Sequence, residues 1–206
     1  MDDSGDVIAH QPRVAFITGP SSTSGGAPGG VPVLAACAVI VREGTSVDLR
    51  SETRRIISEA TTSAARQAGG YEPTMSLLRL LGRVDARCIV TRATHVGGVA
   101  RPIEQFRRVI QQAMVDELVD EGVEIVVLRR RPDNNLHQLD AHLHAERVPA
   151  GIVPGRVRFV QTDAVSEPLL ELPTAIEWAH GEQPGFLARL AGDRLRYRDV
   201  GPDEPR

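Results

Sequence analysis

Residues 102–128 read PIEQFRRVIQQAMVDELVDEGVEIVVL, a helical pattern that passes directly into a strand pattern. The apolar side chains of the first part recur at three- and four-residue steps, the spacing of one helix face: Ile103, Phe106, Ile110, Met114 and Leu118. Pro102 suits the first turn of a helix, and Gly122 stands where a C-terminal cap belongs. The sequence therefore predicts a helix over 102–121 and a strand over 123–128.

The rest of the chain alternates between the same two patterns. Further apolar runs predict strands over 14–18, 33–41, 86–91 and 157–161. Further segments predict helices over 51–67, 75–81, 134–147 and 168–180. Ser166 stands near the N-cap of the last helix. Strands that alternate with helices predict an α/β domain in which helices pack on a central sheet.

Two segments are predicted to lie outside this core. The Gly/Ser/Pro-rich segment 19–32 is expected to form a mobile loop. The charged, proline-containing tail 199–206 is expected to fray from a single domain over 1–198.

All 24 basic side chains among the 206 residues are arginine, because the sequence contains no lysine. A phosphate-loop lysine, a Schiff-base lysine and a lysine general base are therefore excluded. Segment 19–32 follows a strand as a phosphate loop does, but it leads into a second strand instead of a helix, so we interpret it as a hairpin loop. The formal net charge of −3 argues against a dedicated nucleic-acid coat and leaves a local basic patch open.

The two cysteines, Cys37 and Cys88, each lie inside an apolar, strand-like run. Two buried reduced thiols are the favoured interpretation, and a disulfide is the alternative. The acidic, polar N-terminus does not resemble a signal peptide, and no apolar run is long enough to span a bilayer. We therefore expect a cytoplasmic protein without membrane contact.

An arginine triplet, Arg129, Arg130 and Arg131, directly follows the 123–128 strand. The carboxyl ends of strands are where ligands gather in open α/β sheets. Guanidinium groups at such a place can bind phosphate through two hydrogen bonds each. A solvated arginine surface is the alternative interpretation.

Acidic side chains stand at separate places that an α/β fold can bring together. Asp2 lies in the opening run, Asp133 follows the arginine triplet, and Glu171 and Glu177 lie on the predicted 168–180 helix. Carboxylates that converge in this way would hold Mg²⁺ or Mn²⁺, which can activate water and clamp a phosphodiester. With 27 acidic residues in the chain, chance convergence is the alternative.

Two end motifs are more specific. The chain opens on Asp2-Asp3-Ser4-Gly5-Asp6, and a strand and a short connector lead into the run Leu169-Leu170-Glu171-Leu172-Pro173-Thr174. These motifs resemble the Asp-Glu-Ser-Gly opening and the Leu-Leu-Gln-Leu-Ala-Asp late helix of a prokaryotic family of unknown function. The resemblance covers about residues 2–181. It implies a ribonuclease-H-like fold, with a mixed central sheet flanked by helices.

The resemblance also implies metal-dependent phosphodiester cleavage by clustered carboxylates. Asp2 matches the opening acid, although only Met1 precedes it here, whereas a strand leads into the motif in the family. Asp133 matches the mid-chain acid loosely, because Arg129 stands at the strand end. On the late helix, Thr174 occupies the position of the expected Asp and Glu171 that of the Gln.

Carried over residue by residue, the implied catalytic set is Asp2, Asp133 and Glu177. The implied ligands of Mg²⁺ or Mn²⁺ are Asp2, Asp133 and Glu171, and Arg129, Arg130 and Arg131 would contact phosphate. A threonine hydroxyl is a poor substitute for a charged ligand of a hard cation. Glu177, nearly one turn beyond Thr174, is expected to compensate.

Two functional hypotheses follow. The first is a divalent-metal-dependent nuclease or related phosphodiester-processing enzyme, whose partner is nucleic acid. The second is a catalytically degenerate family member that acts as a binding or assembly module, with a protein partner or further copies of itself. The resemblance suggests a mobile-element or phage-defence setting for the second hypothesis. Thr174 favours the second, and the Asp2-Asp3-Ser4-Gly5 opening favours the first.

Overall fold

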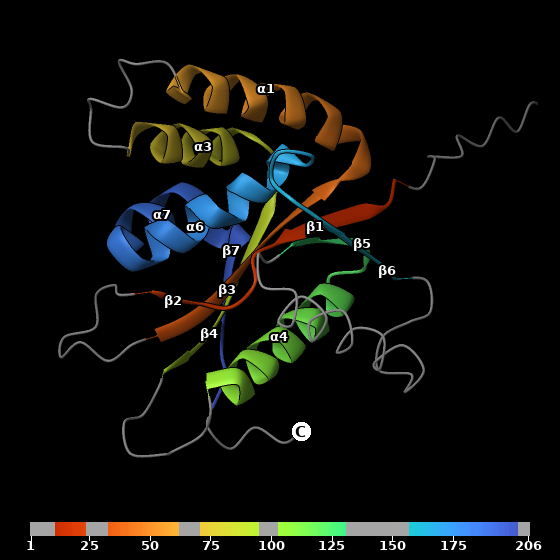
Figure 1. Cartoon of the computed structure of the whole chain (residues 1–206), viewed down its shortest axis with the longest axis vertical. Coiled ribbons are helices and arrows are strands. Elements are labelled where there is room, and N and C mark those ends of the chain that lie inside the picture. Colours follow the sequence, from red (N-terminus) through yellow and green to blue (C-terminus); the bar gives the residue numbers. More distant parts are fainter. Residues whose placement is uncertain (1–10, 24–32, 62–70, 95–102, 131–156, 202–206) are drawn as a thin grey trace, which may run out of the picture.

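The computed structural model of the chain describes residues 11–23, 33–61, 71–94, 103–130 and 157–201. The strands in these ranges are β1 Arg13–Ile17, β2 Ser21–Thr23, β3 Val33–Arg42, β4 Arg87–Thr94, β5 Val123–Arg129, β6 Arg158–Thr162 and β7 Leu195–Asp199. The helices are α1 Glu43–Thr61, α3 Glu72–Arg83, α4 Ile103–Asp120, α6 Glu171–Glu182 and α7 Pro184–Ala191, with the 3₁₀ turns η1 Pro168–Leu170 and η2 Gly192–Arg194. Figure 1 shows helices packed against both faces of a central sheet, so the predicted α/β class is confirmed.

The seven described strands form one mixed sheet in the order β6-β5-β1-β3-β4-β7, and β2 also pairs with β3. β3 runs antiparallel to β1, β2 and β4, whereas β1–β5, β5–β6 and β4–β7 are parallel pairs. All these strands except β3 therefore point in one direction. Their carboxyl ends meet at one edge of the sheet, where α/β folds place their ligands.

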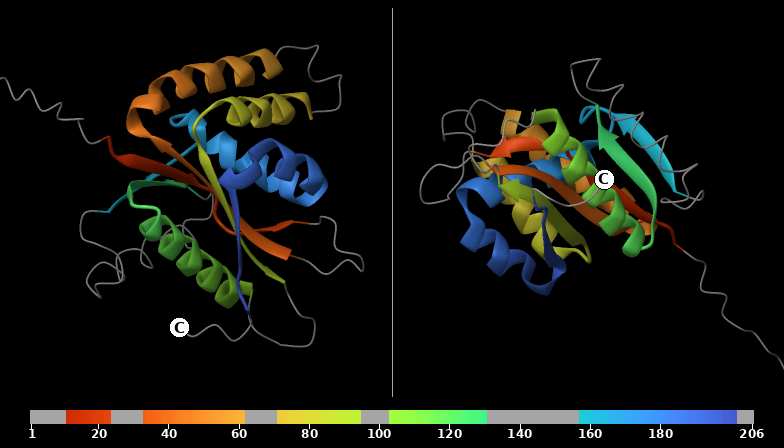
Figure 2. Two further views of the ribbon diagram at one scale, coloured as in Figure 1. Left: turned by 180° about the vertical axis from the view of Figure 1, so that it is seen from behind. Right: turned by 90° about the horizontal axis from the view of Figure 1, so that it is seen from below.

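The central strands β1 and β3 are buried on both faces, which explains their continuous apolar sequences. Successive side chains of a strand point to opposite sides of the sheet. Val14 and Phe16 pack with α1, α3, α6 and α7, whereas Ala15 and Ile17 pack with α4 on the other face. Figure 2 shows the same two layers from behind and from below.

The segment 102–128 folds as its pattern predicts. Helix α4 spans Ile103–Asp120, and β5 begins at Val123. Gly122 between them has a φ of 69°, the left-handed conformation of a helix C-cap that glycine adopts at little cost. The strands predicted over 14–18, 33–41, 86–91 and 157–161 are also present, with ends shifted by one to three residues.

Three predicted helices differ from the structure at their N-termini. Helix α3 begins at Glu72, three residues before the predicted 75–81 segment. Helix α1 begins at Glu43, well before the predicted 51–67 segment. Its first turn contains Gly44 and Thr45, which are weak helix formers. Contacts with the rest of the fold therefore determine the residue at which α1 begins. The 168–180 segment begins as a 3₁₀ turn whose N-cap is Glu167, directly after Ser166, which was predicted to lie near the N-cap.

Four described elements were not predicted: β2, α7, the 3₁₀ turn η2 and β7. β2 lies within the segment expected to be a mobile loop and pairs with β3, while residues 24–32 lie outside the described ranges. β7 runs through Asp199, where the frayed tail was expected to begin. Val200 beyond it is buried, and its N–H donates to the carbonyl of Arg92 at 2.8 Å. The helix predicted over 134–147 lies outside the described residues.

Cys37 and Cys88 lie on neighbouring strands, are buried and form no disulfide, as the favoured interpretation predicted. Among the described helices, none combines the length and apolar character needed to cross a membrane.

Arg194 ties the carboxyl ends of two helices together. Its guanidinium donates to carbonyls at distances from 2.5 to 3.4 Å at the end of α3 and the end of α7: those of Leu81, Gly82, Val84, Leu190 and Ala191. The last carbonyls of a helix lack intrahelical partners and carry partial negative charge, so a cation stabilises them.

We predict that Arg194→Ala lowers the free energy of unfolding by about 2–3 kcal/mol, because charged hydrogen bonds to helix ends are lost. Arg194→Lys is expected to recover less than half of this loss, since an ammonium group has fewer donors and no planar fork. Urea unfolding followed by circular dichroism measures both changes. Arg189→Ala, at an exposed position of α7, is the control. Equal stability of Arg194→Lys and the native chain would contradict the prediction.

Candidate functional site

Helix α6 packs on one face of the sheet and turns polar side chains toward the carboxyl ends of β1 and β5. Glu171 and Thr174 bond to the last residue of β5, and Glu177 bonds to Thr18, which directly follows β1. These three α6 residues are spaced three apart, so they lie on neighbouring turns of one side of the helix. The edge at which parallel strands end is therefore lined by a row of polar groups.

Arg129 is the cation at the centre of this row. Its Nη1 donates to Thr174 Oγ1 at 2.7 Å, and its Nη2 donates to Glu171 Oε1 at 3.0 Å. The Thr174 hydroxyl donates in turn to the carbonyl of Leu170 at 2.9 Å, so its oxygen faces the guanidinium. Both members of the Arg129–Glu171 ion pair are partly buried, which makes the pair stronger than a fully solvated one.

Glu177 lies deeper, beside Thr18 and Cys37. The N–H of Cys37 donates to Thr18 Oγ1 at 3.1 Å, which leaves the Thr18 hydroxyl proton for the Glu177 carboxylate. Burial raises the pKa of Glu177 to about 7, against the opposing effects of the Thr18 hydrogen bond and the Arg129 charge. The site therefore contains a carboxyl group that titrates near neutral pH.

An open groove of about 710 Å³ lies beside Arg129, over the carboxyl ends of β5 and β6. One wall is α1, which contributes Arg54, and Arg129 and Arg130 stand at the end of β5. The opposite wall is the connector from β6 to η1, together with Glu171. The groove thus brings together cations from two segments that lie far apart in the sequence.

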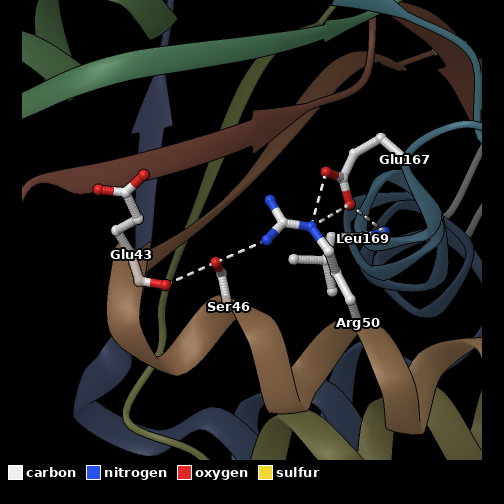
Figure 3. A network of polar contacts seen from close by, with 5 residues as sticks. All are labelled: Glu43, Ser46, Arg50, Glu167 and Leu169. Atoms are coloured by element: carbon white, nitrogen blue, oxygen red, sulfur yellow. Dashed lines mark hydrogen bonds and ion pairs between the residues drawn. The ribbon is translucent and has the colours of Figure 1, made fainter.

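A network of polar contacts joins the two walls of the groove (Figure 3). Arg50 Nε donates to the Glu167 carboxylate at 2.8 Å, and Arg50 Nη1 donates to Ser46 Oγ at 2.8 Å. Glu167 Oε1 also accepts the N–H of Leu169 at 3.2 Å, which caps η1. Glu167 therefore ties the connector to α1 through Arg50 and to η1 through the N–H of Leu169.

The structure brings some of the predicted site residues together. Arg129, Arg130 and Glu171 line the groove. Glu177, on α6, lies close enough to Arg129 to feel its charge. Asp2, Asp133 and Arg131 lie outside the described residues.

Sequence reasoning assigned no site role to Arg54, Thr18 or Glu167. Arg54 is one of several arginines on a polar helix face, and nothing in its spacing marks it. Thr18 was assigned to the end of a strand without a role. Glu167 was passed over in favour of its neighbour Ser166.

A metal ion does not fit the described part of this site. Among the described residues, no three His, Cys, Asp or Glu side chains are placed to hold one ion. The guanidinium of Arg129 lies instead against Glu171 and Thr174, and its permanent charge repels a divalent cation. The predicted ligands Asp2 and Asp133 are outside the described ranges.

No protein-family model matches this chain, and no curated protein matches it significantly.

We predict that Glu177 makes the stability of the protein depend on pH. Its pKa in the folded chain, about 7, lies above the 4.5 of an ordinary glutamate, so the folded state holds this proton more tightly than the unfolded state. The contribution of Glu177 to the free energy of unfolding has its full value below about pH 4.5 and is lost as the pH rises through 7. Glu177→Gln should therefore gain stability relative to the native chain as the pH rises, by up to about 3 kcal/mol at pH 8.

Chemical unfolding of both proteins between about pH 5 and pH 8 measures this difference. Glu182→Gln, an exposed position near the end of the same helix, is the matched control and should follow the native pH profile. Parallel profiles for Glu177→Gln and the native chain would show that Glu177 does not titrate in this range.

Proposed function

We propose that this chain is a catalytically degenerate member of the ribonuclease-H-like family that it resembles, and that it acts as a binding or assembly module. The observation that carries the proposal is the contact of the Arg129 guanidinium with Thr174 and Glu171. A metal-dependent nuclease needs convergent carboxylates around a cation, whereas here a protein cation bonds to the polar groups of the late helix. The mixed sheet flanked by helices agrees with the fold that the resemblance implies.

Two positions support a lost metal site. The resemblance expects an acid near a mid-chain strand end and an acid on the late helix. In the described residues, Arg129 ends β5 and Thr174 lies on α6, and neither side chain is a carboxylate.

A divalent-metal nuclease is the second candidate, and one observation favours it. The side chains of Glu171 and Glu177, on α6, contact residues at the carboxyl ends of strands, where such an enzyme would place its ligands. This candidate requires Asp2 and Asp133 to join them around Mg²⁺ or Mn²⁺ and requires Arg129 to leave Glu171. Its Arg129, Arg130 and Arg131 would then contact the phosphates of nucleic acid.

A nuclease assay separates the two candidates. We predict that the purified chain with Mg²⁺ or Mn²⁺ cleaves neither single- nor double-stranded DNA or RNA above the level of a metal-chelated sample. Any cleavage that appears should persist in Asp2→Ala, Asp133→Ala and Glu177→Gln, which would mark it as a contaminant. Metal-dependent cleavage that these substitutions abolish would contradict the proposal and establish the nuclease.

A further inference from the structure

The groove beside Arg129 also indicates the kind of partner that this chain binds. We propose that it is the docking site for a peptide segment of a protein partner that combines acidic and apolar side chains. The inference rests on the proposed binding function and names the chemistry of its partner.

The groove attracts acidic groups. Its described lining residues include three arginines, Arg54, Arg129 and Arg130, against two carboxylates, Asp163 and Glu171. This local excess of positive charge stands on a chain whose formal net charge is −3. Arg129 donates one N–H from Nη1 to Thr174 and one N–H from Nη2 to Glu171. Each of these nitrogens carries two N–H groups. A carboxylate of a ligand can therefore bond to Arg129 without displacing Glu171.

The same groove offers apolar surface beside its arginines. Ile57 of α1 and Ala164, Val165 and Pro168 of the opposite wall line it, and Val165 is 93% exposed. An exposed aliphatic side chain beside a cationic cluster fits a ligand that has apolar as well as acidic groups.

Nucleic acid fits this surface less well. No aromatic side chain is among the described lining residues, so bases have no stacking platform. A long polyanion also extends beyond the groove over a molecule of negative net charge, which opposes its approach. A short acidic and apolar peptide meets the arginines and the aliphatic wall together.

The groove is formed before any ligand arrives. Arg50 lies one helical turn before Arg54 on α1, and its ion pair with Glu167 fixes the connector that carries Val165. The Arg50 and Glu167 side chains are 30% and 14% exposed, so the pair is shielded from much of the solvent. Binding to a preformed groove costs less ordering entropy than binding to a mobile loop.

Fluorescence anisotropy with the full chain tests the proposal. The probe is a labelled extended peptide of about 12 residues, spanning about 40 Å, that alternates Glu with Leu and Val. One comparison peptide has Ser at the apolar positions, and a second probe is a short single-stranded RNA. The variants are Arg54→Ala with Arg130→Ala, and Val165→Ser. Arg189→Ala on α7 is the control, because this exposed arginine does not line the groove.

We expect the acidic and apolar peptide to bind most tightly of the three probes. The double arginine variant should weaken it about tenfold, as for the loss of two exposed charge pairs. Val165→Ser should weaken it about threefold, and Arg189→Ala should leave it unchanged. Binding should also weaken as NaCl rises from about 0.05 to 0.5 M.

Four results would overturn the proposal. The first is no peptide binding at about 1 mM protein, and the second is equal affinity for the peptide with Ser at its apolar positions. The third is a peptide affinity that the Arg54→Ala and Arg130→Ala substitutions do not change. The fourth is tighter binding of RNA than of the peptide, through these two arginines. The last result would make the groove a nucleic-acid site. Metal-dependent cleavage in the nuclease assay would defeat the proposed function separately, because peptide binding is measured without metal and without a nucleic-acid substrate.

Discussion

The guanidinium of Arg129 joins the end of β5 to the first turns of α6, and the arrangement of the carboxyl edge depends on this contact. A planar group with fixed donor directions can meet a hydroxyl and a carboxylate together, which a lysine would not do in the same geometry. The Arg129 charge also opposes the effect of burial on Glu177. One side chain thus contributes to both the geometry and the electrostatics of the strand ends.

The fold explains why these groups meet. β3 is the antiparallel strand in the middle of the described sheet, so β1, β4, β5, β6 and β7 all end at the same edge. The apolar sides of α6 and its neighbours cover one face of the sheet, which leaves the polar side of α6 at the strand ends. Arg54 comes to the same edge on α1, and the Arg50–Glu167 pair holds that helix against the connector.

Sequence reasoning succeeds here where local pattern decides the structure. The helix–strand segment 102–128 and the apolar strands follow from periodicity, and Gly122 adopts the predicted cap conformation. The start of α1, the strand β2 and the strand β7 depend on pairing and packing with distant segments, which no local pattern reveals. At the site, the position of Arg129 at a strand end was visible, but its bond to Thr174 requires knowledge of where α6 lies. Asp2 and Asp133 stay predictions because they lie outside the described residues.

We propose that Arg129 stands where a metal-dependent enzyme would hold its ion. The most direct test is to soak crystals of the protein in Mn²⁺ and to locate the metal by anomalous scattering. We predict no manganese at the carboxylates of Glu171 and Glu177, and an Arg129 that is still bonded to Thr174. Manganese about 2.2 Å from those carboxylates, with Arg129 displaced, would contradict it.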